Sequence, residues 1–212
     1  MANDKFSIQE ALAYGWATFK ANVPFFLGFM VVMVLLAIVP DAISNKIFEP
    51  KSAGLVVAKI GLRLVGLALG MASTRISLDI YDSGEPNLSR LGELLPRFLP
   101  YLFGKILYGL IVAVGLLLLL IPGVIAAYMF LYVGYLIIDR GLGPIEALQE
   151  SRAVTGGYKM DLFLFSLVVA LLNIVGLVCL FVGLFVTIPV TLMASAYVYR
   201  KLSPPEPAAE TA

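Results

Sequence analysis

Apolar stretches long enough to cross a membrane recur in pairs along this chain, and a short charged stretch with helical spacing precedes each pair. The charged stretches are Ile-Gln-Glu-Ala-Leu at 8–12, Leu-Gly-Glu-Leu-Leu at 91–95 and Ile-Glu-Ala-Leu at 145–148, and the apolar runs after them begin at Pro24, Leu102 and Leu162. This pattern predicts three copies of one unit, a helix followed by an apolar hairpin.

Six apolar segments define the predicted spans. They are 24–43, 55–78, 102–121, 124–138, 162–182 and 184–199. A helix needs about 20 apolar residues to cross a hydrocarbon layer of about 30 Å. The later pairs are joined at Ile121-Pro122-Gly123 and near Gly183, so tightly that their helices must run antiparallel. We therefore predict an all-α polytopic integral membrane protein with six transmembrane helices in three hairpins, and residues 1–202 as one transmembrane domain.

The composition agrees with this class. Of the 212 residues, 60% are hydrophobic and only 14% are charged, whereas soluble domains carry about 25% charged residues. The net charge of +1 argues against a nucleic-acid partner, which would require a basic surface.

The Lys and Arg residues set the expected orientation. Eleven of the 15 fall on the side of the N-terminus, and four fall on the other side, namely Lys46, Lys51, Lys59 and Arg63. Because cytoplasmic loops carry the excess of positive charge, both termini are predicted to be cytoplasmic. The N-terminus has no signal-sequence pattern, so the first span is expected to be retained as an anchor. Tyr197, Tyr199, Arg200 and Lys201 would anchor the last cytoplasmic boundary.

The three charged stretches predict amphipathic helices that lie in the membrane interface. Ser7 and Glu10 have the spacing of a capping box before the first, and Gly156-Gly157 is expected to end the third. The Pro-rich residues 203–212 are predicted to form a disordered tail.

Several motifs resemble one group of bacterial membrane proteins. They are Ile121-Pro122-Gly123, Ile138-Asp139-Arg140, Glu-Ala-Leu-Gln-Glu-Ser at 146–151, Thr155-Gly156-Gly157, and Val-Thr-Ile-Pro at 186–189 with Tyr199-Arg200. Mainly over residues 100–201, the chain is similar to uncharacterised six-helix inner-membrane proteins related to the membrane domain of some glycerophosphodiester phosphodiesterases. The resemblance implies a fold and a bacterial cytoplasmic (inner) membrane location. It does not extend to the soluble phosphodiesterase domain, so that activity is not implied.

Five cations are candidate anion-binding or lipid-binding residues. Lys59 and Arg63 stand at i and i+4 on one helix face, where they would bind a lipid phosphate or anionic solute, or extend to the outer headgroups. Arg75 would bind a lipid head or pair with Asp79 one turn later. Arg152 and Lys159 flank Gly156-Gly157 and would contact anionic lipid.

Asn173 is the polar residue expected deepest in the membrane, within the fifth span. Its amide is predicted to hydrogen-bond to another helix, and a transport site is the alternative. Asp139 and Asp161 are interpreted as solvated helix ends.

Catalytic residues are not apparent. The chain has no His to activate a nucleophile, and its carboxylates fit no metal-binding spacing. Cys179, the single cysteine, is interpreted as a small buried or lipid-facing residue. We expect neither an enzyme nor a cofactor.

Two functional hypotheses follow. The first is a non-catalytic structural or accessory membrane protein that binds membrane lipids, partner membrane proteins or a second copy of itself. The alternative is a small transporter or lipid-handling permease, because internal repeats and Pro-interrupted helices are features of transporters.

Overall fold

The computed structural model describes residues 6–49, 52–179 and 182–204, with the backbone alone described at 120 and 121. Every regular element within these ranges is a helix, as predicted. The helices are α1 (Ile8–Ala21), α2 (Val23–Ile47), α3 (Ala53–Ser83), the 3-10 helix η1 (Leu88–Leu94), α4 (Phe98–Leu118), α5 (Leu120–Met129), α6 (Val133–Arg140), α7 (Pro144–Val154), α8 (Lys159–Val178) and α9 (Leu184–Leu202).

Local signals in the sequence set several helix ends. The Ser7 and Ser52 hydroxyls accept hydrogen bonds from the amides of Glu10 and Leu55, which caps α1 and α3. Gly84 and Gly141 end α3 and α6 with φ of +81° and +68°, a conformation in which only glycine avoids a steric penalty.

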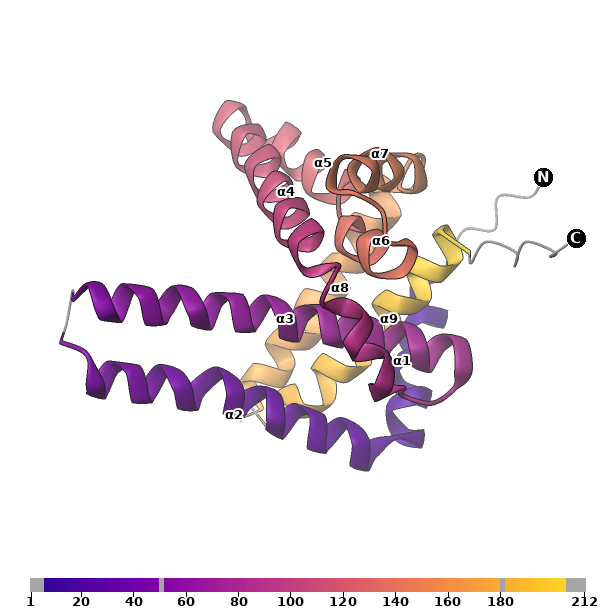
Figure 1. Ribbon diagram of the computed structural model, residues 1–212. Coiled ribbons are helices and arrows are strands. Elements are labelled where there is room, and N and C mark those ends of the chain that lie inside the picture. Colours follow the sequence, from indigo (N-terminus) through magenta and orange to yellow (C-terminus); the bar gives the residue numbers. More distant parts are fainter. Residues whose placement is uncertain (1–5, 50–51, 180–181, 205–212) are drawn as a thin grey trace, which may run out of the picture.

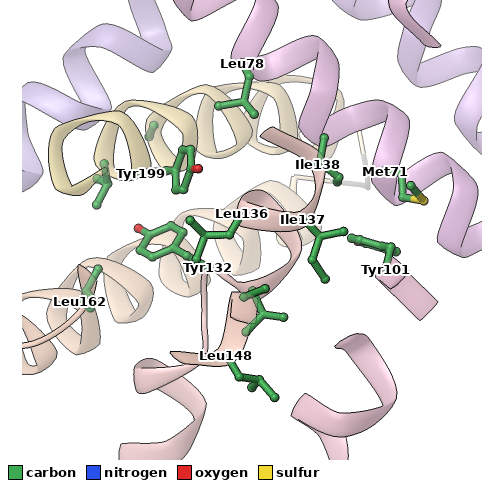
Figure 2. Close-up of a cluster of buried hydrophobic side chains, with 14 of the residues drawn as sticks. Met71, Leu78, Tyr101, Tyr132, Leu136, Ile137, Ile138, Leu148, Leu162 and Tyr199 are labelled. Atoms are coloured by element: carbon green, nitrogen blue, oxygen red, sulfur yellow. The ribbon is translucent and has the colours of Figure 1, made fainter. Parts of the chain in front are cut away.

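A single helix, α6, lies at the centre of the main core. Leu136, Ile137 and Ile138 are completely buried, and Figure 2 shows them surrounded by side chains from other helices, among them Leu78 of α3, Tyr101 of α4 and Tyr199 of α9. We call this region, in which α1, α7 and the near ends of α3, α4, α8 and α9 pack around α6, the hub.

From the hub, apolar hairpins extend in different directions. In Figure 1, α2 and α3 run side by side to one side of the molecule, whereas α4 and α5 point another way. Large apolar side chains on these hairpins are exposed, for example Ile38 at 61%, Val57 at 69% and Leu117 at 87%. Apolar surface on this scale is the kind that lipid or a protein partner covers.

Five helices within the described residues are long and apolar enough to cross a membrane. They are Val23–Ile47, Ala53–Ser83, Phe98–Leu118, Pro122–Arg140, which joins most of α5 to α6 through a turn at 130–132, and Lys159–Val178. The sixth predicted span, 184–199, lies in α9 but is not among them, because Arg200 and Lys201 in the last turn make α9 less apolar. Six spans are therefore not confirmed.

Two of the predicted amphipathic helices bury part of their apolar faces in protein, although Trp16 and Ile145 are exposed. α1 lies along α9, so close that a Cβ on Gly15 would be 2.3 Å from the carbonyl oxygen of Val190. α7 buries Ala147 and Leu148. The second stretch, 91–95, overlaps the 3-10 helix η1 and does not form an α-helix, because Pro96 has no N–H for the Gly92 carbonyl, which instead accepts from Leu95.

Candidate functional site

Arg200 is the centre of a charged network inside the hub. Its guanidinium, 4% exposed, donates to both carboxylate oxygens of Asp139 at 2.6 and 2.9 Å and to Asp82 at 2.5 and 2.9 Å. Tyr199 donates to the same Asp139 at 2.8 Å. These bonds tie α9 to α3 and α6, and bidentate guanidinium–carboxylate pairs are strong and geometrically specific.

This network corrects two expectations. Asp139 was interpreted as a solvated helix end, but its side chain is only 13% exposed and carries the charge that Arg200 needs. Arg200 and Tyr199 were expected to anchor the chain at the membrane boundary, but both are buried. Only Lys201 and Tyr197 remain at the surface, with the Lys201 ammonium 5.6 Å from the centre of the Tyr197 ring.

Arg75 belongs to a second buried network. Its guanidinium lies 3.1 Å from Asp79, and Arg90 reaches the same carboxylate oxygen at 3.0 Å. The predicted i, i+4 pairing of Arg75 with Asp79 is therefore present. With a side chain only 7% exposed, Arg75 is part of the hub and does not face the surface.

Further polar bonds connect helices around the hub. Arg140 donates to Glu150 at 3.1 Å and to Ser203 at 2.8 Å, and Arg97 donates to the Ile138 carbonyl. Ser203, the first residue of the predicted tail, is thus buried and bonded, whereas residues 205–212 lie outside the described residues.

Aromatic contacts hold α1 on the hub. The Tyr14 ring lies 5.3 Å from both the Tyr81 ring of α3 and the Tyr197 ring of α9. Burial raises the pKa of the Tyr14 phenol, so this group stays neutral at physiological pH.

Lys59 and Arg63 are found together in an open groove between α2 and α3. The groove has a volume of about 820 Å³ and is lined by Leu36, Ala37, Asp41, Lys59, Leu62, Arg63, Gly66, Leu67 and Leu69. In the described part of the chain, neither cation has an ion-pair partner within 4 Å. Sequence reasoning missed Asp41, although an acidic residue inside the apolar segment 24–43 was a signal for it.

Arg152 and Lys159 are exposed at the ends of α7 and α8. Lys159 borders a smaller, mostly apolar groove of about 250 Å³ that Ile125, Tyr128 and Phe163 also line. Neither cation has an ion-pair partner within 4 Å among the described residues, so both are free to meet an anion.

Asn173 makes the predicted contact with another helix. Its amide donates to the Thr191 hydroxyl of α9 at 3.4 Å and to the Val169 carbonyl at 3.0 Å. The residue therefore joins α8 to α9. Within the described ranges, no three His, Cys, Asp or Glu side chains gather as metal ligands would.

Comparison with known proteins places the chain in a family. Residues 90–212 match a family described as a domain of unknown function, DUF7847. The chain belongs to this family. It is also similar, over 72% of its length, to proteins called uncharacterised from Mycobacterium bovis (30% identical) and from two strains of Mycobacterium tuberculosis (30% and 32%). The matched region is 47% of each relative's length, and no solved structure matches the chain.

The DUF7847 match divides the two charged regions of the molecule. It includes Arg97, Asp139, Arg140 and Arg200 of the hub, and it leaves α1 and the α2–α3 hairpin outside. The hub therefore lies largely within the shared domain, and the groove lies in the preceding segment.

Proposed function

We propose that this DUF7847 protein is a non-catalytic integral membrane protein that binds lipids or partner membrane proteins with the surfaces between its hairpins. One observation carries the proposal. The charged side chains that hold the helices together are gathered in the hub, while apolar hairpins diverge from it and leave their side chains uncovered. In a membrane, lipid acyl chains or apolar helices would cover them.

We place the protein in the bacterial cytoplasmic membrane with six spans, three hairpins and both termini in the cytoplasm. The bias of Lys and Arg toward the hub side supports this orientation. α9 would be the sixth span, since α1, α3 and α8 shelter it and a sheltered helix needs less apolar surface. A relation to the membrane domain of glycerophosphodiester phosphodiesterases is a further part of the proposal and rests on the motifs described above.

Native mass spectrometry of the protein released from nanodiscs made with bacterial lipids tests the proposed function. A stoichiometric lipid or a retained partner protein is the expected result. A bare monomer, at collision energies that leave lipid on a reference membrane protein, would contradict it.

The α2–α3 groove favours transport as the second candidate function, because Lys59 and Arg63 both line a concave surface. Pro40 and Pro189 also lie inside α2 and α9, and helices with internal proline are a feature of transporters. Uptake of radiolabelled phosphate into proteoliposomes, measured for wild type and for an Arg63→Gln variant, distinguishes the transport function from the binding function. Uptake that depends on Arg63 supports transport, and uptake no faster than in empty liposomes counts against phosphate transport.

A further inference from the structure

The spacing of Arg63 and Arg75 along α3 places at least one of them within the hydrocarbon layer of a membrane. Arg63 and Arg75 are twelve residues apart, which is about 18 Å along a helix. A hydrocarbon layer is about 30 Å thick, so both residues cannot lie outside it on opposite sides. Arg75 is neutralised by Asp79. Because an uncompensated charge in the bilayer is costly, Arg63 requires a counter-charge that the hairpin itself does not bring within 4 Å.

The groove arranges charges of both signs at similar levels of the hairpin. Asp41 stands six residues before the end of α2 and Lys59 six residues after the start of α3, so the two lie at matching heights. Arg63 lies one turn deeper, by about 6 Å. No ion pair joins Asp41 to Lys59 or Arg63 within this described hairpin, and Asp41 accepts a hydrogen bond from Asn45 at 3.1 Å.

A backbone carbonyl adds a second hydrogen-bond acceptor to the groove, besides the carboxylate of Asp41. Pro40 lies inside α2 and has no N–H to donate to the carbonyl of Leu36, four residues earlier. Leu36 lines the same groove. Its carbonyl thus lacks its usual helical donor, and Asp41 lines the same groove.

We propose that the α2–α3 groove binds the headgroup of a zwitterionic aminophospholipid, such as phosphatidylethanolamine. Lys59 and Arg63 bind the phosphodiester, and Asp41, with the Leu36 carbonyl, accepts hydrogen bonds from the primary ammonium. The leucines of the groove contact the acyl chains. A volume of about 820 Å³ is within the range of about 300–1,000 Å³ for small-molecule sites.

This inference rests on the proposed lipid-binding function and names its ligand class. A headgroup with one negative and one positive charge matches both parts of the groove. Phosphatidylglycerol would leave Asp41 without a counter-charge, and inorganic phosphate would leave the apolar walls uncovered.

The test is native mass spectrometry of the delipidated full-length protein, titrated with equal amounts of phosphatidylethanolamine and phosphatidylglycerol. Wild type is expected to retain more phosphatidylethanolamine. Lys59→Gln with Arg63→Gln should weaken retention about tenfold or more, because charge-assisted hydrogen bonds to the phosphate are lost. Asp41→Asn should remove the preference for phosphatidylethanolamine while keeping phosphatidylglycerol binding.

Lys46→Gln is the matched control, because this cation is on the same hairpin but does not line the groove. Thermal unfolding of each variant checks that the hairpin still folds. Arg63→Lys, with Lys59 intact, is a second variant that preserves the charge and should keep most of the lipid binding.

Two results would overturn the inference while the proposed function stands. One is lipid retention that is equal in wild type and the double variant, and the other is an unchanged lipid preference in Asp41→Asn. Adducts with the mass of inorganic phosphate in place of a phospholipid would also overturn it. If wild type retains neither lipid, the lipid-binding function fails together with the groove.

Discussion

Arg200 and Asp139 are 61 residues apart in the chain and share two hydrogen bonds, of 2.6 and 2.9 Å, inside the hub. Asp82, from the first hairpin, is a second carboxylate bound to the same guanidinium. One arginine of the last helix is therefore bound to carboxylates from the two earlier hairpins. An arginine side chain stays protonated at physiological pH, so its charge is always present to join α9 to α3 and α6.

Replacing Arg200 should therefore destabilise the whole domain. Arg200→Gln leaves Asp139 buried without a counter-charge, and removing one partner of a buried pair costs about 3–5 kcal/mol. Thermal unfolding in detergent, followed by circular dichroism, measures the loss. Arg152→Gln is the control, because this exposed cation has no ion-pair partner within 4 Å in the described ranges, and it should unfold like wild type.

Arg200→Lys gives a sharper version of the same test. A single ammonium cannot reproduce the planar, two-sided contact with Asp82 and Asp139, so its stability should fall between those of wild type and Arg200→Gln. If all three proteins unfold at the same temperature, the network does not hold the hub together.

The contact between α1 and α9 predicts a steric effect at Gly15. Gly15→Ala places a Cβ 2.3 Å from the Val190 carbonyl oxygen, and such overpacking costs about 1–3 kcal/mol. Gly28→Ala is the matched helical control, because no atom lies within 4 Å of its added Cβ. Its free energy of unfolding should stay within about 1 kcal/mol of wild type. Equal losses from both substitutions would mean that α1 is not closely packed on α9.

The sequence predicted the helices better than their packing. Long apolar runs and the local caps at Ser7 and Ser52 determine where α1, α2 and α3 lie, because these signals act within one or two turns. The pairing of Arg75 with Asp79 was predictable for the same reason. The partner of Arg200 was not, since no local pattern marks a carboxylate 61 residues away.

For the candidate site, too, the sequence predicted the local pair of residues but not the packing between helices. Lys59 and Arg63 were recognisable as a pair because they are one turn apart, but the groove also needs Asp41 from the neighbouring helix. The register of the α2–α3 hairpin brings them together, and that register depends on packing. The second expected amphipathic helix is not an α-helix for a local reason that was visible in advance, namely Pro96 directly after the stretch 91–95.

Asn173 and Thr191 predict a measurable coupling between α8 and α9. Asn173→Leu should lower stability by about 0.6–2 kcal/mol, the range for polar contacts between membrane helices. Thr191→Val removes the hydroxyl that accepts this bond. In a double-mutant cycle the second substitution should cost less in the Asn173→Leu background, and strictly additive effects would show that the two side chains do not interact.

Single-cysteine labelling tests the proposed topology, because Cys179 is the single cysteine of the chain and Cys179→Ser removes it. Glu49 is exposed in the connection between α2 and α3, at the end of the first hairpin away from the hub. With the hub in the cytoplasm, a membrane-impermeant maleimide should label a Cys179→Ser, Glu49→Cys variant in intact spheroplasts. In a Cys179→Ser, Glu93→Cys variant, the new thiol lies at an exposed hub position and should be labelled only after lysis. The reverse pattern would place the hub outside and invert the proposed orientation.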